Sequence, residues 1–359
     1  MIIGFDARYA EGDLVGVGKY IQSLVTGVAK SGRTCIVFYS REPKVKISGT
    51  TAVILNSVNR YHFEQVLLPI ALKKYKVDLY HATGNVGVPL FCPVPALLTV
   101  HDIIPLEIKD YFSYSPFSFL SKLSYVLRLK ASIFKAAKIV TDSNYVKNVL
   151  IIKLKVTPEK IQTIYLGSPG TIMPGKLPLN LIGKKYVLNH GGIDIRKNLD
   201  RLIEAFALVH KKHGEIKLVI TGENKRMRED LEKLIGKLNL GNSVVFTGYL
   251  DDATLSAVIK SACLICYPTL SEGFGFPVLE GFGKEIPVIS SNISSIPEVV
   301  GNAAILVNPE RVNDIAGAME KVLDNSEQAH EMVLKGKAQY NKFSWEKCVN
   351  EYLDLYNHI

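Results

Sequence analysis

The sequence predicts an α/β protein made of two doubly wound parallel sheets, each in its own domain. Short apolar or β-branched runs alternate with helical stretches almost throughout, which is the pattern of parallel strands joined by crossover helices. The 359 residues suit two domains of roughly 150–200 residues each. Near the middle, the Gly- and Pro-rich segment 167–175 interrupts the alternation and is the best candidate for a linker.

Both halves of the chain carry a full series of strands and helices. In the first half, strands are predicted at 2–5, 34–39, 52–55, 77–81, 96–100, 138–141 and 161–165, with helices near 18–30, 63–75, 116–137 and 144–153. In the second half, strands are predicted at 186–188, 217–221, 244–246, 264–267, 287–290 and 304–307. Helices are predicted there at 199–213, 227–238, 252–262, 277–283 and 311–324, and a final helix follows Ser344. Two such sheets place ligands at the carboxyl ends of their strands, which face each other across a cleft.

The net charge of +9 is concentrated in the first half of the chain. Residues 1–175 contain 21 Lys and Arg against 11 Asp and Glu. Nucleic acid, an anionic membrane surface or a phosphorylated substrate could each account for this excess. The sequence carries no signature of a nucleic-acid-binding module, so we do not expect nucleic acid as a partner.

Cysteine usage and hydropathy indicate a cytoplasmic enzyme. The five cysteines do not suggest a disulfide framework. Cys263 and Cys266 lie in a strand-like run, where residues three apart point to opposite faces, so we interpret them as buried thiols. The N-terminus enters a buried strand directly and lacks the features of a signal peptide. No apolar run is long enough to predict a transmembrane helix.

The most informative motif is a Gly-rich turn between a strand and a helix, Ser271-Glu272-Gly273-Phe274-Gly275-Phe276-Pro277-Val278-Leu279-Glu280. Pro277 sits where a helix would begin, and a helix N-terminus favours an anion such as a diphosphate. Glu272 and Glu280 can both face one pocket, and carboxylates suit sugar and ribose hydroxyls because they accept paired hydrogen bonds. The alternative is a capping loop with two surface glutamates.

A second loop of this kind, residues 191–199, again follows a strand and precedes a helix. Its Arg196 and Lys197 can neutralise a diphosphate, Arg through bidentate bonds and Lys as a point charge. Such cations would stabilise the charge that develops on a leaving phosphate. Taken alone, a solvated Arg-Lys pair at a helix start is the more common interpretation.

Two sites in the first half are less specific. His101 and Asp102 end an apolar run and therefore belong to the carboxyl end of a strand, although a lone histidine is more often structural. His81, also at a strand end, is a weaker candidate. Gly16 and Gly18 open the first helix but lack the spacing of the dinucleotide fingerprint, so an ordinary helix-start turn is an equally good interpretation.

These motifs resemble the retaining glycosyltransferases of family 4, which have the GT-B fold. The resemblance rests on the E-x7-E spacing from Glu272 to Glu280, on the segments 246–250, 287–291 and 296–301, and on the loop with Arg196 and Lys197. It covers nearly the whole chain and is strongest from about 186 to 324. One departure is Gly192, since many relatives carry an arginine there; Arg196 would take over that role.

The resemblance implies a role for each site residue. Glu272 would contact the transferred sugar, Glu280 the nucleotide ribose, and Arg196 and Lys197 the diphosphate. His101 would approach the donor sugar, with Asp102 as a support or acceptor contact. Backbone amides would meet the donor at Phe274, Gly275 and Phe276 and at Gly16 and Gly18, and loop contacts at Gly248 and Tyr249 would help read the base.

The resemblance also implies the domains and the substrates. Residues 1–175 would form the acceptor-binding domain and 176–342 the nucleotide-sugar-binding domain, with 343–359 a helix that packs back on the first. The expected donor is GDP-mannose, with UDP- or dTDP-sugars as alternatives, and the acceptor a glycan or lipid-linked sugar of cell-surface polysaccharide or glycolipid synthesis. We expect no metal and no cofactor besides the donor. Oligomeric state stays open.

A basic amphipathic helix predicted at 115–138 suggests a peripheral membrane surface as a further partner, at the inner face of the cytoplasmic membrane. A domain helix with a solvated basic face is the alternative.

Two other functions compete with glycosyl transfer. A nicotinamide-dependent oxidoreductase would need a dinucleotide fingerprint that the chain lacks. A non-catalytic nucleotide-sugar-binding scaffold would be indicated by loss of the charged site residues, all of which are present.

Overall fold

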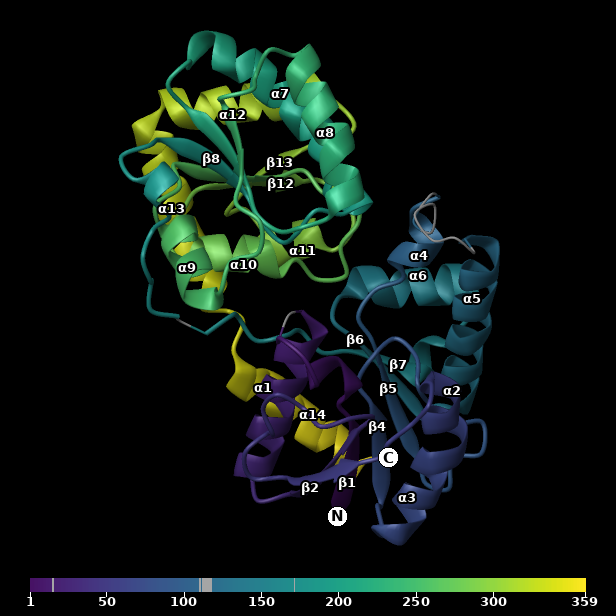
Figure 1. Cartoon of the computed structure of the whole chain (residues 1–359). Coiled ribbons are helices and arrows are strands. Elements are labelled where there is room, and N and C mark those ends of the chain that lie inside the picture. Colours follow the sequence, from purple (N-terminus) through teal and green to yellow (C-terminus); the bar gives the residue numbers. More distant parts are fainter. Residues whose placement is uncertain (15, 110, 112–117, 171) are drawn as a thin grey trace. The chain divides into compact units, whose positions relative to one another are not determined.

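The computed structural model describes residues 1–14, 16–109, 111, 118–170 and 172–359. Within these, the chain forms two compact units (Figure 1). Unit 1 comprises Met1–Gly167 and Phe343–Ile359, and unit 2 comprises Ser168–Lys342. Each unit is a parallel sheet covered by helices, so the predicted α/β class with two Rossmann-like sheets is confirmed.

Unit 1 contains a seven-stranded sheet in the order β3-β2-β1-β4-β5-β6-β7, all parallel. Its strands are β1 (Ile2–Asp6), β2 (Thr34–Tyr39), β3 (Thr51–Ile54), β4 (Leu79–Ala82), β5 (Ala96–Val100), β6 (Lys138–Thr141) and β7 (Ile161–Thr163). Its helices are α1 (Val17–Lys30), α2 (Arg60–His62), α3 (Leu68–Lys74), α4 (Ile104–Glu107), α5 (Ser118–Lys135), α6 (Asn144–Leu154) and α14 (Trp345–Asn357). Residues 115–117 of the predicted basic helix lie outside the described part.

Unit 2 repeats the plan with six parallel strands in the order β10-β9-β8-β11-β12-β13. The strands are β8 (Tyr186–Asn189), β9 (Lys217–Ile220), β10 (Val244–Phe246), β11 (Leu264–Tyr267), β12 (Val288–Ser291) and β13 (Ile305–Val307). The helices are α7 (Leu199–Lys212), α8 (Lys225–Lys237), α9 (Asp252–Lys260), α10 (Phe276–Gly283), α11 (Ile296–Val300), α12 (Val312–Asp324) and α13 (Ser326–Tyr340). If the strands are renumbered from 1 within each unit, both sheets begin with the strand order 3-2-1-4-5-6. The strand order reverses between β1 and β4 in unit 1 and between β8 and β11 in unit 2.

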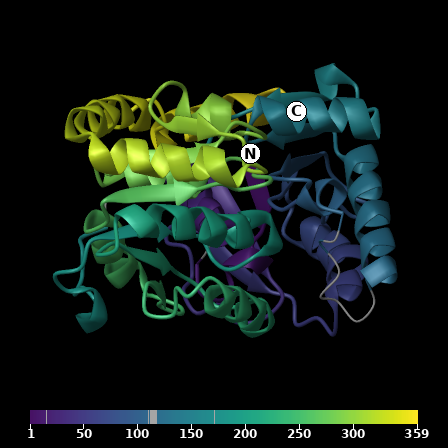
Figure 2. The same ribbon diagram turned by 90° about the horizontal axis from the view of Figure 1, so that it is seen from above.

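Helix starts follow the sequence closely because short polar side chains cap them. Ser143 accepts a hydrogen bond from the Val146 N–H at α6, and Asp251 accepts from the Ala253 and Thr254 N–H groups at α9. Ser344 caps α14 in the same way. Helix α13 was not predicted, because α12 leads into it through Asn325 alone, without glycine or proline. Figure 2 shows α12 and α13 together in unit 2.

Helix α14, at the end of the chain, is part of unit 1 and lies beside α1. The two helices approach closely at Gly27, where an added Cβ would lie 2.5 Å from Val349 Cγ2. A buried hydrogen bond of 2.8 Å joins the hydroxyls of Tyr20 on α1 and Tyr352 on α14. The last helix therefore completes the core of the first unit.

Candidate functional site

The centre of unit 2 is the point where the strand order reverses, between β8 and β11. The loops that leave these two strands are joined by backbone contacts. Leu270 N donates to Arg196 O at 2.7 Å, and Thr269 Oγ1 donates to the same carbonyl at 2.9 Å. Ligands of doubly wound sheets bind at such a reversal, outside the carboxyl ends of the strands. We take this edge of unit 2 as the candidate active site.

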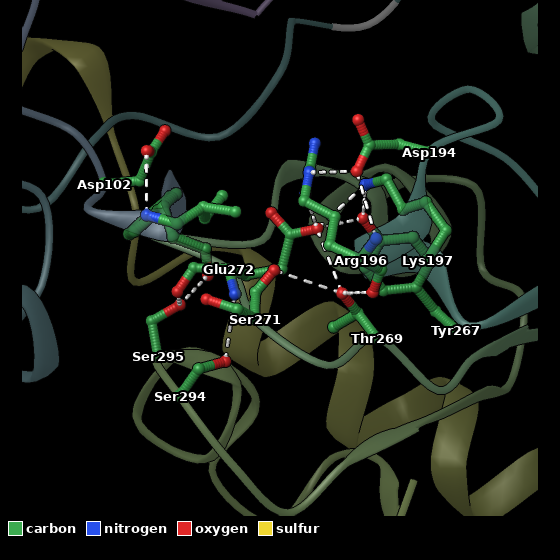
Figure 3. Close-up of polar contacts among 12 residues, drawn as sticks. Asp102, Asp194, Arg196, Lys197, Tyr267, Thr269, Ser271, Glu272, Ser294 and Ser295 are labelled. Atoms are coloured by element: carbon green, nitrogen blue, oxygen red, sulfur yellow. Dashed lines mark hydrogen bonds and ion pairs between the residues drawn. The ribbon is translucent and has the colours of Figure 1, made fainter. Parts of the chain in front are cut away.

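Glu272, Arg196, Lys197 and Tyr267 form one cluster at this edge, which we call the charge cluster and which is buried except for the partly exposed Arg196 (Figure 3). Lys197 Nζ lies 2.8 Å from Glu272 Oε1, and Arg196 forms an ion pair with the same oxygen. The Tyr267 hydroxyl also donates to Oε1 and accepts a hydrogen bond from Lys197. The Lys197 side chain is only 2% exposed, so this lysine is not the solvated surface charge that its position at a helix start suggested.

Burial and pairing fix the charges in this cluster. Burial lowers the pKa of Lys197 to about 8, although Glu272 opposes that shift. Burial alone would raise the pKa of Glu272, but Arg196 and Lys197 outweigh it and hold that pKa at about 2. Both groups are therefore ionised at neutral pH. The side-chain contacts of Glu272 with Arg196, Lys197, Tyr267 and Thr269 all converge on Oε1.

Asn198 was missed by the sequence analysis, although it fixes the loop that carries both cations. It adopts a left-handed conformation with φ of 58°, which asparagine tolerates better than most residues. Its Nδ2 donates to Pro268 O at 3.0 Å and to Pro309 O at 2.7 Å. Asn198 thus ties the end of the β8 loop to the end of β11 and holds Lys197 beneath the turn at Glu272.

The Gly-rich turn leads directly into α10, and Gly275 is the residue that precedes the helix. Gly275 has φ of 111°, and an added Cβ there would lie 2.8 Å from Ile296 Cδ1. Ser295 Oγ donates to Glu272 O at 2.9 Å and to Phe274 O at 3.0 Å. The rings of Phe274 and Phe276 pack edge to face at 5.5 Å. Strand β12 and the serines after it therefore hold the turn in place at the start of α10.

Glu280 lies on α10 and is oriented by a residue that the sequence analysis did not select. His190 Nε2 lies 2.9 Å from Glu280 Oε2, and the His190 side chain is 1% exposed while that of Glu280 is 24% exposed. The signal available in the sequence was the position of His190, directly after β8 and before two glycines. An added Cβ at Gly191 would lie 3.1 Å from Pro277 Cγ and 3.3 Å from Lys197 Nζ, so this loop runs between α10 and the charge cluster.

The predicted base-reading loop also lies at the carboxyl edge of unit 2. Gly248 pairs with Gly222 in an isolated bridge, and both have positive φ. An added Cβ at Gly222 would lie 2.5 Å from Gly192 Cα. The loops after β8, β9 and β10 therefore meet through glycines: the close packing requires glycine at 222, and Gly192 has a positive φ of 91°. Tyr249 is 61% exposed.

In unit 1, His101 follows β5 and is almost fully buried. Its Nδ1 lies 2.7 Å from Asp142 Oδ2, and its Nε2 lies 2.8 Å from Thr83 O. Both ring nitrogens are thus engaged inside the unit. Asp102 accepts from the Ile104 N–H at 3.3 Å, at the start of α4. His81 lies in the core, between Thr99 Oγ1 and the Tyr356 hydroxyl.

Gly16 and Gly18 open α1 in unit 1, at the carboxyl end of β1. Gly16 precedes the helix with φ of 44°. An added Cβ at Gly18 would lie 2.6 Å from Tyr9 O, so α1 packs against the loop after β1 at a distance that only glycine permits. A close helix-start turn therefore accounts for both glycines without a ligand.

Three further observations concern the cysteines, possible metal ligands and possible membrane spans of the described residues. Cys266 is buried in β11 as predicted, and burial raises the pKa of its thiol, whereas Cys263 directly precedes the strand and is only half-buried. No group of three or more His, Cys, Asp or Glu side chains that could hold a metal occurs among the described residues. Of the helices described, none is both long and apolar enough to cross a membrane.

The two Rossmann-like units define the GT-B class of fold, and comparison with known structures agrees. A sucrose-phosphate synthase from Thermosynechococcus elongatus superposes with a TM-score of 0.78 at 19% identity, covering 99% of this chain and 98% of that one. Anabaena Alr3699/HepE, solved in complex with UDP-glucose, gives a TM-score of 0.80 at 14% identity and covers all of both chains. At these identities the likeness establishes the fold alone.

Sequence comparison then gives the family. The family model for glycosyl transferases group 1 matches residues 179–339, and that for glycosyltransferase family 4 matches residues 15–168. The chain therefore belongs to glycosyltransferase family 4. Among its relatives is the O-antigen chain mannosyltransferase B of Escherichia coli, 27% identical over 298 residues that cover 80% of this chain and 76% of the relative.

Proposed function

We propose that the protein transfers mannose from GDP-mannose, with retention, to a glycan or lipid-linked acceptor during synthesis of a cell-surface polysaccharide or glycolipid. The charge cluster beside the start of α10 is the observation that carries the proposal. Arg196 and Lys197 supply two cations for a diphosphate, and the first turn of α10 adds N–H groups that favour the same anion. The mannosyltransferase among the relatives supports the choice of sugar.

In this proposal, unit 2 binds the donor and unit 1 the acceptor. Glu280, held by His190, binds the ribose hydroxyls, and Oε2 of Glu272 accepts a hydrogen bond from the transferred sugar. The acceptor hydroxyl attacks on the face from which the diphosphate leaves. An oxygen of the departing phosphate takes the acceptor's proton, while Arg196 and Lys197 stabilise the charge that develops there. With two cations in place, we expect transfer to proceed without a metal ion.

The first test is a thermal-shift screen against GDP, UDP, ADP, dTDP and NAD without added metal. GDP at about 100 times its Kd is expected to stabilise the protein by about 2.7 kcal/mol. Glu280→Ala should weaken GDP binding about tenfold or more, because a hydrogen bond between a charged group and the ribose is lost. The exposed Glu229→Ala serves as the matched control. Stabilisation by UDP or dTDP alone would replace the proposed donor, and NAD alone would overturn the donor class.

A non-catalytic nucleotide-sugar-binding scaffold is distinguished by turnover. A scaffold would be stabilised by GDP but would release no GDP from GDP-mannose when acceptor is present. The retention of Arg196, Lys197 and Glu272 in one cluster favours an enzyme, since binding alone does not require a buried carboxylate between two cations.

We also propose that helix α5 contacts the anionic inner face of the cytoplasmic membrane, where a lipid-linked acceptor would lie. Leu120, Leu123 and Leu127 follow helical spacing and are 60%, 45% and 58% exposed, and Phe134 farther along is 77% exposed. Three exposed lysines accompany this apolar stripe, namely Lys122, Lys130 and Lys135. Arg128 does not belong to the basic face, because its guanidinium turns inward and pairs with Glu64 at 2.6 Å.

Replacing these three lysines by glutamine is expected to lower binding to phosphatidylglycerol-containing vesicles about a hundredfold, at about 1 kcal/mol per lysine near an anionic surface. A vesicle co-sedimentation assay measures the change. The matched control replaces Lys184, Lys185 and Lys237 of unit 2, which are also exposed, and alters the net charge equally. Equal binding by both triple variants would return α5 to the role of an ordinary domain helix.

A further inference from the structure

The two ring nitrogens of His101 both face groups that can only accept a hydrogen bond. Nε2 lies 2.8 Å from the carbonyl oxygen of Thr83, and Nδ1 lies 2.7 Å from Oδ2 of Asp142. Each nitrogen must therefore carry a proton to make its bond, since a carbonyl and a carboxylate offer none. The geometry requires an imidazolium in an ion pair with Asp142.

His81, in the same unit, is buried equally well and provides an internal comparison. Its nitrogens lie 2.9 Å from the Tyr356 hydroxyl and 2.7 Å from Thr99 Oγ1. Hydroxyls donate or accept, so a neutral ring satisfies both bonds. Burial lowers the pKa of His81 to about 3, and the neighbouring charge of His101 adds to this. The two histidines therefore differ in charge because their hydrogen-bond partners differ, and not because they are buried.

The groups around His101 favour the same charge state. Burial lowers its pKa, but Asp142 outweighs this through charge and hydrogen bonding, Thr83 and Asp102 add to the effect, and the net pKa is raised. The Tyr20 ring packs edge-on against the imidazole at 4.6 Å. Burial keeps the hydroxyl of Tyr20 and the nearby thiol of Cys348 neutral by raising their pKa values.

Asp142 is buried beside this histidine and pairs with it. Its side chain is 3% exposed, and Oδ1 has no hydrogen-bond partner in the described part of the chain. A buried carboxylate without a counter-ion is costly, so the two groups depend on each other for their charge. The pair joins the carboxyl ends of β5 and β6, at the edge of the sheet where unit 1 is expected to bind its substrate.

We propose that Asp142 is a positioning residue for glycosyl transfer, which holds the His101 ring as an imidazolium in one orientation. His101 then supplies a positive charge at the carboxyl edge of unit 1, where the proposed acceptor binds, and does not act as a proton acceptor. This inference rests on the proposed function. It agrees with a mechanism in which the departing phosphate, and not a histidine, takes the acceptor's proton.

The charge state can be tested without any substrate. In protein labelled with ¹⁵N-histidine, two-bond ¹⁵N–¹H correlation spectra distinguish an imidazolium from either neutral tautomer. At neutral pH we expect imidazolium signals that are assigned to His101 by their loss in His101→Gln, and a neutral His81. In Asp142→Asn the His101 signals should move to the neutral form, while those of His81 stay. A neutral His101 in the unaltered protein would overturn the proposal, whether or not the enzyme transfers mannose.

The positioning role can be tested by the pH dependence of kcat. In the unaltered enzyme the falling limb of kcat from His101 should lie at higher pH than in Asp142→Asn, because Asp142 raises the pKa of His101 above its ordinary value near 6.5. In Asp142→Asn that pKa drops, so kcat should fall about tenfold per pH unit as pH rises. Asp142→Glu should restore part of the activity at high pH, and Glu159→Gln, an exposed carboxylate of unit 1, should match the unaltered enzyme. A loss in Asp142→Asn that is equal at every pH would mean that Asp142 only supports the fold.

Discussion

Replacing Lys197 by methionine is expected to slow sugar transfer about a hundredfold. Methionine keeps most of the buried aliphatic volume and removes the charge. The loss of one charged hydrogen bond to the leaving phosphate, roughly 3 kcal/mol in the transition state, accounts for the factor. Arg196→Gln should have an effect of similar size, because its guanidinium belongs to the same cluster. Single-turnover kinetics with excess enzyme measure the transfer step directly.

The acceptor's apparent affinity should change little in either variant, since both residues lie in unit 2 and serve the donor in our proposal. Lys211→Met, an exposed lysine on α7, removes the same charge from the same unit and serves as the control. Glu272 keeps Arg196 as a counter-ion when Lys197 is replaced, so Lys197→Met should still fold. Unchanged turnover in both variants would remove the phosphate-binding assignment.

Replacing Glu272 by leucine is expected to destabilise the fold by about 3–5 kcal/mol, because Lys197 then stays buried without its counter-ion. Urea denaturation of the purified protein measures this loss. The double variant Lys197→Met with Glu272→Leu should recover most of it, since a buried ion pair replaced by apolar groups of similar volume is often nearly neutral. Glu229→Leu, at an exposed position on α8, is the matched control.

The contribution of Glu272 should disappear at acid pH. Its pKa is about 2 in the folded protein against an ordinary value of 4.5, so between these values the unfolded chain binds more protons than the folded one. Stability therefore rises with pH across this window, and the contribution is complete above it. The stability difference between the unaltered protein and Glu272→Leu should shrink as pH falls from about 5 toward about 2. A difference that is constant with pH would show that Glu272 stabilises the fold by packing and not by charge.

Much of the fold could be predicted because its signals are local. The alternation of apolar strands with amphipathic helices is visible in the order of residues along the chain. The side chains of Ser143, Asp251 and Ser344 cap helices and so mark where these helices begin. The Gly-rich turn before α10 was located for the same reason, since glycine permits the positive φ of Gly275 and the fixed φ of Pro277 suits the first turn of a helix in any context. Helix α13 was missed because Asn325, a single residue, separates it from α12.

Interactions between distant residues could not be predicted in the same way. Arg128 had the spacing of a solvated face, yet it pairs inward with Glu64, which belongs to a different helical segment. His190 carried no motif, and its bond to Glu280 exists because the loop after β8 passes the start of α10. Which residues meet across a sheet depends on strand order, and local periodicity does not contain that order.

The sequence by itself therefore determined the two parallel sheets, the glycine turns at their carboxyl ends and the acidic and basic residues that these turns carry. Only the tertiary structure decided the charges. It buried Lys197 against Glu272, made His81 neutral and gave His101 a carboxylate partner in Asp142. The physical reason is that the charge of a buried group is set by the few atoms packed against it, and folding brings those atoms from remote parts of the chain.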